Sequence, residues 1–362
     1  MSNFETSPHP DAPQKARKPP APQKLVGIEN LVKEFSIGKE SFGRKPTMLR
    51  AVDNVSLEIN SGETFGLVGE SGCGKTTIAR CLMRLAIPSS GRIMFRDTDV
   101  TALKGKELRR FRLHMQMVFQ DPHASLDSRM TARQIVEEPL TIHDIGDRKE
   151  RREKVDEILT LVGIDPSQGN RKPHGFSGGQ AQRIALARAL VLNPDMLVLD
   201  EPVSALDVSI QAQVLNFLRD IQDRFSLTYL FIVHDLVVAE YFCDRIAVLY
   251  LGAVVEMAES HVLFREPLHP YTVSLVSAVP VPDPESRGRG SRIVLSGEVS
   301  PSGAQMSGCR FRTRCPIGRN RENCRDISPK LVEKSPGHWV ACHFPGELEH
   351  AVTAASNIAS PP

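Results

Sequence analysis

The sequence has little net charge, no long apolar run and few cysteines. Its 45 Lys and Arg nearly balance 43 Asp and Glu, and the resulting formal charge of +2 gives no global reason to expect nucleic-acid binding. The least polar stretch, Ile246 to Val255, is interrupted by Gly252 and is far shorter than the ~18–20 residues that cross a bilayer. Residues 1–10 are polar, unlike a secretory signal peptide. We therefore expect a protein that stays in the cytosol and reaches a membrane only through partners.

The remaining composition is that of a globular protein. Of 362 residues, 41% are hydrophobic and 24% charged, which argues against a disordered or fibrous chain and suggests about two domains. Seven cysteines are too few for a disulfide scaffold over this length. Four of them fall within residues 309–342, and in a reducing cytosol such a cluster indicates metal more often than disulfide.

Composition divides the chain into five segments. Residues 1–24 are rich in Pro, Lys and Arg and are expected to form a flexible arm. Residues 25–262 alternate strands with helices, which predicts an α/β domain around a parallel sheet. Residues 263–292 resemble a Pro- and Arg-rich linker, 293–346 a small metal-binding C-terminal domain with four cysteines, and 347–362 a disordered tail.

Apolar periodicity places the main elements of the α/β domain. Residues 25–35 and 52–59 are expected to pair in an antiparallel sheet, and the apolar runs 196–199 and 229–233 have the character of buried parallel strands. A shorter strand is expected at 65–68, and helices are expected at 75–85, 151–162, 180–192 and 208–225.

The segment Gly69-Glu70-Ser71-Gly72-Cys73-Gly74-Lys75-Thr76 matches the phosphate-binding pattern G-x-x-x-x-G-K-[ST] between a strand and a helix. Glycines let backbone N–H groups wrap phosphates, and the helix N-terminus adds partial positive charge. Lys75 would contact the β- and γ-phosphates, Thr76 would ligate Mg²⁺, and Thr77 follows in the same helix. A glycine-rich turn without a ligand is the alternative. At a helix start, the Cys73 thiol is expected to have a lowered pKa and to be alkylated unless nucleotide protects it.

A second candidate site lies where the apolar run 196–199 ends in two carboxylates. Asp200 would hold Mg²⁺ through water, and Glu201 would orient or deprotonate the attacking water. Alone, such a pair is usually the solvated start of a loop. After a phosphate-binding loop, the catalytic interpretation is favoured.

The sequence Phe176-Ser177-Gly178-Gly179-Gln180 resembles the signature motif of ATP-binding cassette (ABC) ATPases. Other family elements follow the same order. Gln120 is similar to the glutamine that senses Mg²⁺ and the membrane partner, and His234 to the switch histidine near the γ-phosphate. Residues 204–207, ending at Asp207, resemble the D-loop, and Phe35 stands where the family stacks an aromatic residue on adenine. A strand-end Phe is also often a core residue.

The resemblance spans residues 25–260 and implies a P-loop ABC ATPase fold, with a parallel sheet core, an antiparallel β subdomain and a helical subdomain. Two such domains would enclose two ATP molecules, each held by the P-loop of one subunit and by residues 177–180 of the other. Residues 116–122, the insertion 38–47 and Leu268-His269-Pro270-Tyr271-Thr272 resemble the ATP-binding subunits of dipeptide and oligopeptide importers.

That narrower resemblance implies an ATPase that drives peptide import at the cytoplasmic face of the membrane. Its partners would be a second, different ABC ATPase, two integral membrane permeases and an extracytoplasmic substrate-binding protein, with no nucleic acid. Three alternatives remain open: an importer of nickel or another small solute, a soluble ABC ATPase, and a redox-sensing regulatory subunit.

The C-terminal cysteines, Cys309, Cys315, Cys324 and Cys342, suit either zinc or an iron–sulfur cluster, and their spacing cannot separate the two. The resemblance to peptide-importer ATPases implies a [4Fe–4S] cluster, with zinc as the alternative. The cysteines could also simply pack in a small core. The arginines around them, from Arg287 to Arg314, are expected to lie in a solvated linker rather than to bind anionic lipid or nucleic acid.

Overall fold

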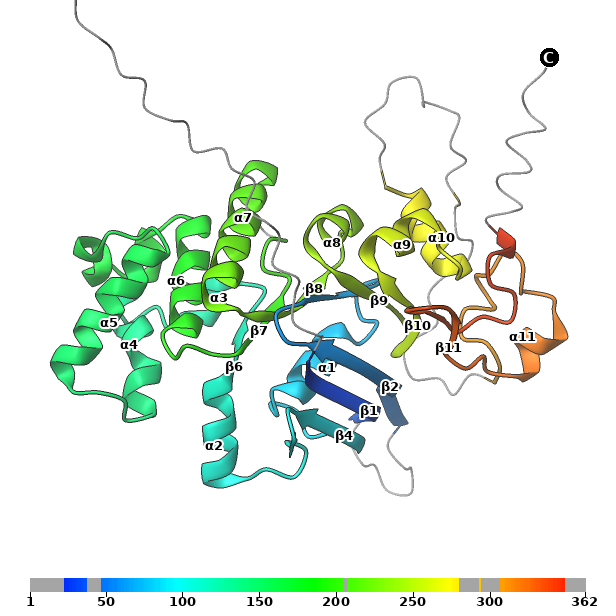
Figure 1. Ribbon diagram of the computed structural model, residues 1–362, viewed down its shortest axis with the longest axis horizontal. Coiled ribbons are helices and arrows are strands. Elements are labelled where there is room, and N and C mark those ends of the chain that lie inside the picture. The colour runs from blue at the N-terminus through cyan, green and yellow to red at the C-terminus, as the bar shows by residue number, and fades with distance from the viewer. Residues whose placement is uncertain (1–22, 38–46, 205–206, 280–292, 294–306, 349–362) are drawn as a thin grey trace, which may run out of the picture.

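The computed structural model of the chain describes residues 23–37, 47–204, 207–279, 293 and 307–348. Most of the predicted N-terminal arm, of the 38–47 insertion and of the C-terminal tail lies outside these residues. The arginine tract 287–292 also lies outside them. Within the described part of the chain, the elements form two sheets flanked by helices (Figure 1).

The first sheet is antiparallel and has the order β2-β1-β4-β5. It consists of β1 (Lys24–Ile37), β2 (Thr47–Asn60), β4 (Ser90–Phe95) and β5 (Thr98–Asp99). The predicted pairing of the first two strands is confirmed, with Ile28 opposite Leu57 and Phe35 opposite Leu49.

The second sheet has the order β11-β12-β10-β9-β3-β8-β7-β6. Its parallel part contains β9 (Arg245–Tyr250), β3 (Thr64–Val68), β8 (Thr228–Val233), β7 (Met196–Asp200) and β6 (Met115–Val118). Every residue of β3, β7 and β8 is buried, as expected for strands covered by helices on both faces. The predicted parallel core is therefore confirmed.

The remaining strands of this sheet are antiparallel: β10 (Ala253–Glu259), β12 (His338–Val340) and β11 (Val332–Ser335).

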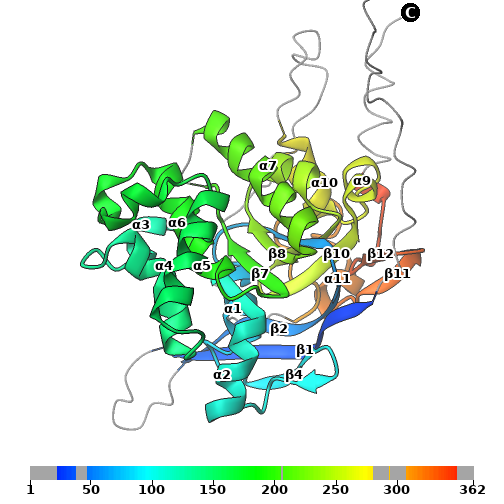
Figure 2. The same ribbon diagram turned by 60° about the vertical axis from the view of Figure 1, so that its left-hand side comes forward.

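Helices cover the second sheet and build a subdomain at one side. Those of the subdomain are α3 (Pro122–Ser125), α4 (Ala132–Ile142), α5 (Arg148–Leu161) and α6 (Gly178–Leu190), with 3₁₀ turns η1 (Pro166–Asn170) and η2 (Pro173–Gly175). Figure 2 shows α3 to α6 gathered on one side of the sheet. The others are α1 (Lys75–Leu82), α2 (Gly105–His114), α7 (Val208–Phe225), α8 (Leu236–Phe242), α9 (Ser260–Arg265), α10 (Pro270–Ser277) and α11 (Glu322–Asp326). No helix in the described residues is long and apolar enough to cross a membrane.

Local sequence signals explain where several helices begin. Thr131, Asp147 and Ser177 each accept a hydrogen bond from the backbone N–H three residues on, and the Gln or Glu at that position bonds back to the cap. This reciprocal capping box satisfies N–H groups that the first helical turn leaves free. Helices predicted at 151–162, 180–192 and 208–225 are found at 148–161, 178–190 and 208–225.

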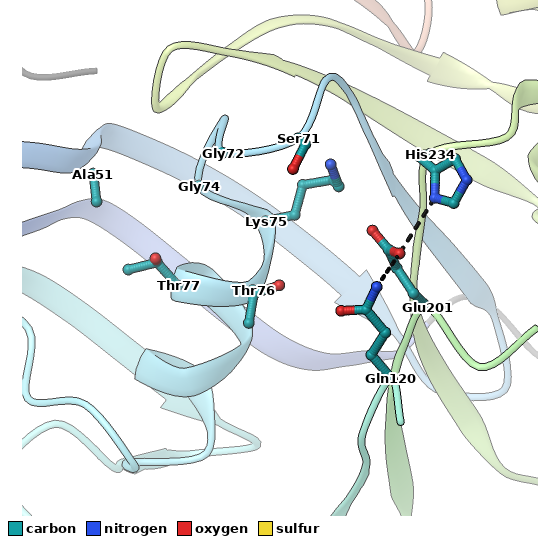
Figure 3. A pocket seen from close by; sticks show the side chains of 10 residues that line it. All are labelled: Ala51, Ser71, Gly72, Gly74, Lys75, Thr76, Thr77, Gln120, Glu201 and His234. Carbon is teal, nitrogen blue, oxygen red and sulfur yellow. Dashed lines mark hydrogen bonds and ion pairs between the residues drawn. The ribbon is translucent and has the colours of Figure 1, made fainter. Parts of the chain in front are cut away.

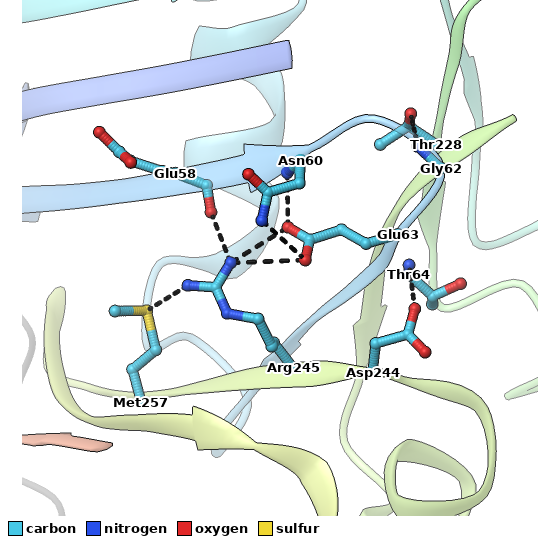
Figure 4. A network of polar contacts seen from close by, with 9 residues as sticks. All are labelled: Glu58, Asn60, Gly62, Glu63, Thr64, Thr228, Asp244, Arg245 and Met257. Carbon is cyan, nitrogen blue, oxygen red and sulfur yellow. Dashed lines mark hydrogen bonds and ion pairs between the residues drawn. The ribbon is translucent and has the colours of Figure 1, made fainter. Parts of the chain in front are cut away.

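A polar network ties the first sheet to the parallel core (Figure 4). Arg245 at the start of β9 donates to the Glu58 carbonyl at 3.2 Å and to the Glu63 carboxylate at 3.2 Å. Asp244 accepts from the Thr64 backbone N–H at 2.7 Å. Burial raises the pKa of Glu63, while the Asn60 backbone N–H and Arg245 favour its charged form. The network fixes β2, β3 and β9 relative to one another. Because the P-loop follows β3 directly, its position depends on this arrangement.

The C-terminal segment joins the second sheet, since β12 pairs with β10 through Glu256 opposite Val340. Glu256 is fully buried and accepts hydrogen bonds from the Leu268 N–H at 2.7 Å, the His269 N–H at 2.9 Å and His338 Nε2 at 2.7 Å. His269 in turn caps α10 through Nδ1. The expectation of a linker from residue 263 is wrong for 263–279, because Glu256 and a buried face of α10 hold this segment against the core.

Candidate functional site

A polar cavity of about 440 Å³ opens at the end of the parallel strands where β3, β7 and β8 terminate. In α/β sheets this carboxyl edge is the usual place for ligands. Its lining brings together nine residues predicted for the ATP site: Ser71, Gly72, Gly74, Lys75, Thr76, Thr77, Gln120, Glu201 and His234 (Figure 3). Ala51, which the sequence did not predict, also lines it.

The P-loop follows β3 directly and wraps the start of α1. Gly69 and Gly74 have φ of 152° and 108°, and a Cβ on either would come within 2.4 Å of a backbone oxygen, of Leu249 and Ala51 respectively. Only glycine fits there without displacing the backbone. Lys75 Nζ donates to the Gly69 carbonyl at 2.6 Å and to the Glu70 carbonyl at 3.1 Å. Its ammonium group is therefore held inside the loop that would surround the phosphates.

Two side-chain oxygens that could ligate a metal ion, from Thr76 and Asp200, lie close together beside the P-loop. Thr76 Oγ1 lies 3.0 Å from Asp200 Oδ1 and donates to it. Burial raises the pKa of Asp200, while the bond from Thr76 and the nearby Arg80 and Lys75 favour the charged form. A hydroxyl and a carboxylate are hard oxygen ligands, so these residues fit Mg²⁺.

Glu201 is the meeting point of the predicted catalytic residues. Gln120 Nε2 donates to Glu201 Oε2 at 2.8 Å, and His234 Nδ1 lies 3.3 Å from the same oxygen (Figure 3). Glu201 has φ of 49°, in the left-handed region that non-glycine residues rarely occupy, and its N–H bonds to the Ile232 carbonyl at 3.0 Å. The turn directs the carboxylate of the residue after β7 into the cavity.

The predicted signature residues form the start of α6 and do not line this cavity. Ser177 caps the helix, Gly178 and Gly179 are its first residues, and the Gln180 side chain bonds back to the Ser177 N–H at 3.1 Å. Asp207 occupies the N-cap position of α7, and residues 205–206 lie outside the described residues. The predicted contact of residues 177–180 with a nucleotide on another subunit stays a prediction.

Phe35, the predicted adenine-stacking residue, lies on β1 beside Lys33, whose Nζ is 4.8 Å from the ring centroid. Phe35 is 40% exposed and is not part of the cavity lining, to which Ala51 contributes from β2. The stacking role of Phe35 stays a prediction.

The expectation of a reactive, acidic Cys73 is wrong. The thiol is 5% exposed, and burial raises its pKa above the ordinary value. Lys75 and the helix start favour the thiolate, but desolvation outweighs them because little water reaches the sulfur. Cys73 is a packing residue beneath the P-loop.

The four C-terminal cysteines lie near one another, but in the described residues no group of three or more His, Cys, Asp or Glu side chains is arranged to hold a metal ion. Burial raises the pKa of Cys309 to about 11 and that of Cys342 to about 12, so a metal bound here would have to displace the thiol protons. Gly318 lies between Cys315 and Cys324 and donates to Cys315 Sγ at 3.2 Å. As they lie here, the cysteines do not fit the predicted metal centre.

The expectation that the arginines near the cysteines are solvated is wrong for two of them. Arg314 forms a bidentate pair with Glu70, at 2.9 and 3.0 Å, and its side chain is 9% exposed. Arg310 pairs with Asp53. Sequence reasoning missed these contacts, and also the Tyr271 hydroxyl that accepts from the Glu70 N–H at 3.0 Å. The partners are 201 to 257 residues apart, so no local pattern could reveal them.

Comparison with known proteins gives two matching family models. Residues 52–204 match the model described as ABC transporter, and residues 255–324 match that described as oligopeptide/dipeptide transporter, C-terminal region. The first covers the cavity residues from the P-loop to Glu201. The second includes α10, Arg310, Arg314 and three of the four cysteines.

Individual proteins match over most of the chain. A putative oligopeptide transport ATP-binding protein of Bacillus subtilis, YkfD, is 50% identical over 88% of this chain and 95% of its own. AppF of the same organism, an oligopeptide transport ATP-binding protein, is 47% identical over 88% and 97%. Among solved structures, the dimeric ATP-binding cassette MJ0796 with ADP and phosphate matches with TM-score 0.58 and 31% identity, over 65% of this chain and 99% of that one.

Proposed function

The chain belongs to the ABC transporter family, among the ATP-binding subunits of oligopeptide and dipeptide importers, and it hydrolyses ATP to power peptide import; from this premise we propose how its residues divide the work. The observation that carries the assignment of roles is the convergence of Gln120 and His234 on one oxygen of Glu201 beside the P-loop. Phosphoryl transfer to water needs positioning and charge neutralisation more than covalent chemistry.

ATP binds in the cavity with its phosphates in the P-loop. The backbone N–H groups of residues 71–77 surround the phosphates, and Lys75 exchanges its bonds to the Gly69 and Glu70 carbonyls for the β- and γ-phosphates. Phe35 supplies a stacking surface for the adenine.

Thr76 would hold the Mg²⁺ directly and Asp200 would hold it through water, with Gln120 as a further ligand. The ion neutralises charge on the phosphates when bound. Binding it also favours an ionised Asp200, against the burial that raises the pKa of this carboxyl in the free chain.

Glu201 accepts a proton from the attacking water or orients it toward the γ-phosphate. A carboxylate acting as general base must lie within hydrogen-bond reach of that water, and Glu201 lines the same cavity as Lys75 (Figure 3). Gln120 and His234 hold the carboxylate, and His234 then faces the γ-phosphate.

A second ATPase subunit completes the site. Residues Ser177 to Gln180 begin α6 and do not line the chain's own cavity, so their N–H groups and the helix dipole act on a nucleotide held by the partner. Asp207 lies at the same dimer face. MJ0796, whose solved structure is a dimer with ADP and phosphate, supports this arrangement.

The transporter partners follow from the family. ATP hydrolysis drives conformational change in permease subunits in the membrane. We assign three kinds of partner: two permease subunits, a second and different ATPase subunit, and an extracytoplasmic binding protein. The chain then lies at the cytoplasmic face of the membrane, held by its partners.

A [4Fe–4S] cluster on Cys309, Cys315, Cys324 and Cys342, or a zinc ion in its place, is supported by the donor chemistry of four neighbouring cysteines and opposed by their present arrangement. No step of hydrolysis depends on it. Anaerobic purification followed by iron, sulfide and zinc analysis tests the proposal, with Cys315→Ser as the control. Absence of all three elements contradicts it.

The function is tested with the assembled transporter in liposomes. We expect peptide-loaded binding protein to stimulate ATP hydrolysis and peptide to accumulate in the lumen toward which the permeases import. Stimulation by nickel ions in place of peptide would instead support an importer of small solutes. Hydrolysis that responds to neither would contradict an import function.

A further inference from the structure

Glu70, the second residue of the P-loop, bonds to two residues from the C-terminal part of the chain, Tyr271 and Arg314. Its carbonyl accepts from Lys75 Nζ at 3.1 Å and from the Cys73 N–H at 3.2 Å, so its backbone helps to shape the loop. Its N–H donates to the Tyr271 hydroxyl at 3.0 Å. Its carboxylate bonds to Arg314, and Glu70 is not among the residues that line the cavity.

The ion pair between Arg314 and Glu70 has bidentate geometry and a mostly buried arginine. Both guanidinium Nη atoms bond to the two carboxylate oxygens, at 2.9 and 3.0 Å, in the bidentate geometry that gives the strongest charge-assisted hydrogen bonds. Arg314 lies 5.9 Å from the Tyr250 ring centroid and is mostly buried. Phe311, 1% exposed, packs against the rings of both Tyr250 and Tyr271, at centroid distances of 5.2 and 5.5 Å, and anchors this segment.

A second contact reaches the P-loop from the same segment. Arg310 donates to the Leu251 carbonyl at 2.8 Å and pairs with Asp53 on β2. Gly252, which follows Leu251 in the chain, donates its N–H to the carbonyl of Cys73 in the P-loop at 2.9 Å. Figure 1 shows this C-terminal segment, in orange, beside β10. The stretch 309–315 therefore supports the P-loop both directly and through the β9–β10 turn.

We infer that Arg314 is a positioning residue for ATP binding: through Glu70 it holds the P-loop in its binding shape and neutralises a carboxylate that would otherwise repel the phosphates. Arg310 supports the same loop through the turn at Leu251. The inference rests on the proposed nucleotide site and adds that the region after the ABC domain helps to set the affinity of that site.

The experiment measures ATP affinity of the full chain with a fluorescent ATP analogue. We expect Arg314→Met to raise the Kd about tenfold, the change to which 1.4 kcal/mol corresponds. Turnover of the assembled transporter at saturating ATP should stay within about twofold, because Arg314 is not among the residues that line the cavity. Misfolding would instead lower the active fraction and leave the Kd of the remaining protein unchanged. Arg314→Lys should restore part of the affinity.

Two comparisons isolate the contact. In a Glu70→Gln background, Arg314→Met should change the Kd by less than about twofold, since coupled residues are non-additive. Arg312→Met is the matched control, because Arg312 lies in the same segment and donates to the Ser307 and Arg325 carbonyls instead. An unchanged Kd in Arg314→Met, an equal increase in Arg312→Met, or an undiminished effect in the Glu70→Gln background would each overturn the inference. Wild-type protein that binds no ATP would contradict the nucleotide site itself.

Discussion

Replacing Glu201 with glutamine should separate ATP binding from hydrolysis. Glutamine keeps the size of the side chain and an oxygen that can accept from Gln120, now 2.8 Å away, but it cannot take a proton from water. A positioned general base contributes about 10²- to 10⁴-fold, or about 2.7–5.5 kcal/mol of the barrier. We therefore expect kcat to fall by at least about 10²-fold. The Kd for ATP should be unchanged or lower, since removing a carboxylate from the cavity reduces repulsion of the phosphates.

The assay compares steady-state phosphate release by the assembled transporter with equilibrium ATP binding by the same variant. Glu153→Gln is the matched control, because Glu153 lies on α5 with its side chain 67% exposed and pairs with Lys149 at 3.9 Å, away from the cavity lining. Turnover that stays within about twofold of wild type in Glu201→Gln would remove this carboxylate from the mechanism. A loss of hydrolysis accompanied by an equal loss of ATP affinity would show that Glu201 acts in binding rather than in the transition state.

Three further outcomes follow from the geometry. Burial lowers the pKa of His269 to about 4, so between that value and its ordinary 6.5 the unfolded chain binds more protons and stability falls with falling pH. The free energy of unfolding from urea titrations should fall by about 2 kcal/mol more between pH 7 and pH 5 in wild type than in His269→Asn. Asparagine keeps the cap of α10, so the comparison isolates the titration of the imidazole. An equal fall in both proteins would contradict the burial of His269. Ser177→Ala should leave ATP binding by the isolated chain unchanged but lower hydrolysis by the assembled transporter, and weaker binding by the isolated chain would place Ser177 in its own site. Cys73 should react with iodoacetamide at pH 7.5 more slowly than a free thiol, with or without ATP, and mass spectrometry showing rapid labelling would refute its burial.

Much of the ATPase site could be predicted because its chemistry depends on short, contiguous patterns. The P-loop needs glycine where a Cβ would meet a backbone oxygen, as at Gly74, and it needs Lys75 and Thr76 in the next helical turn. The acidic pair Asp200 and Glu201 ends the uninterrupted apolar run of β7, and such a run predicts a buried strand. Parallel strands end at one edge of a sheet, so Asp200 and Glu201 had to lie near the loop. The individual roles of these residues stay predictions.

Predictions failed where burial by distant residues decided the outcome. The position of Cys73 at a helix start favours a thiolate, yet the packing around it raises its pKa. Residues 263–279 carry prolines that suggest a linker, yet Glu256 on β10 binds the N–H groups of Leu268 and His269 and draws α10 onto the core. Neither effect depends on neighbours in the chain.

The sequence by itself determined the strand–loop–helix of the P-loop, the buried parallel strands and the capped start of α6, because each depends on residues within a few positions of one another. Only the tertiary structure decided that Glu201, Gln120 and His234 meet at one oxygen and that Arg314 bonds to Glu70. Such contacts join residues that are 33 to 244 positions apart in the chain. They form because sheet order and side-chain packing bring distant segments together, and no local pattern encodes that meeting.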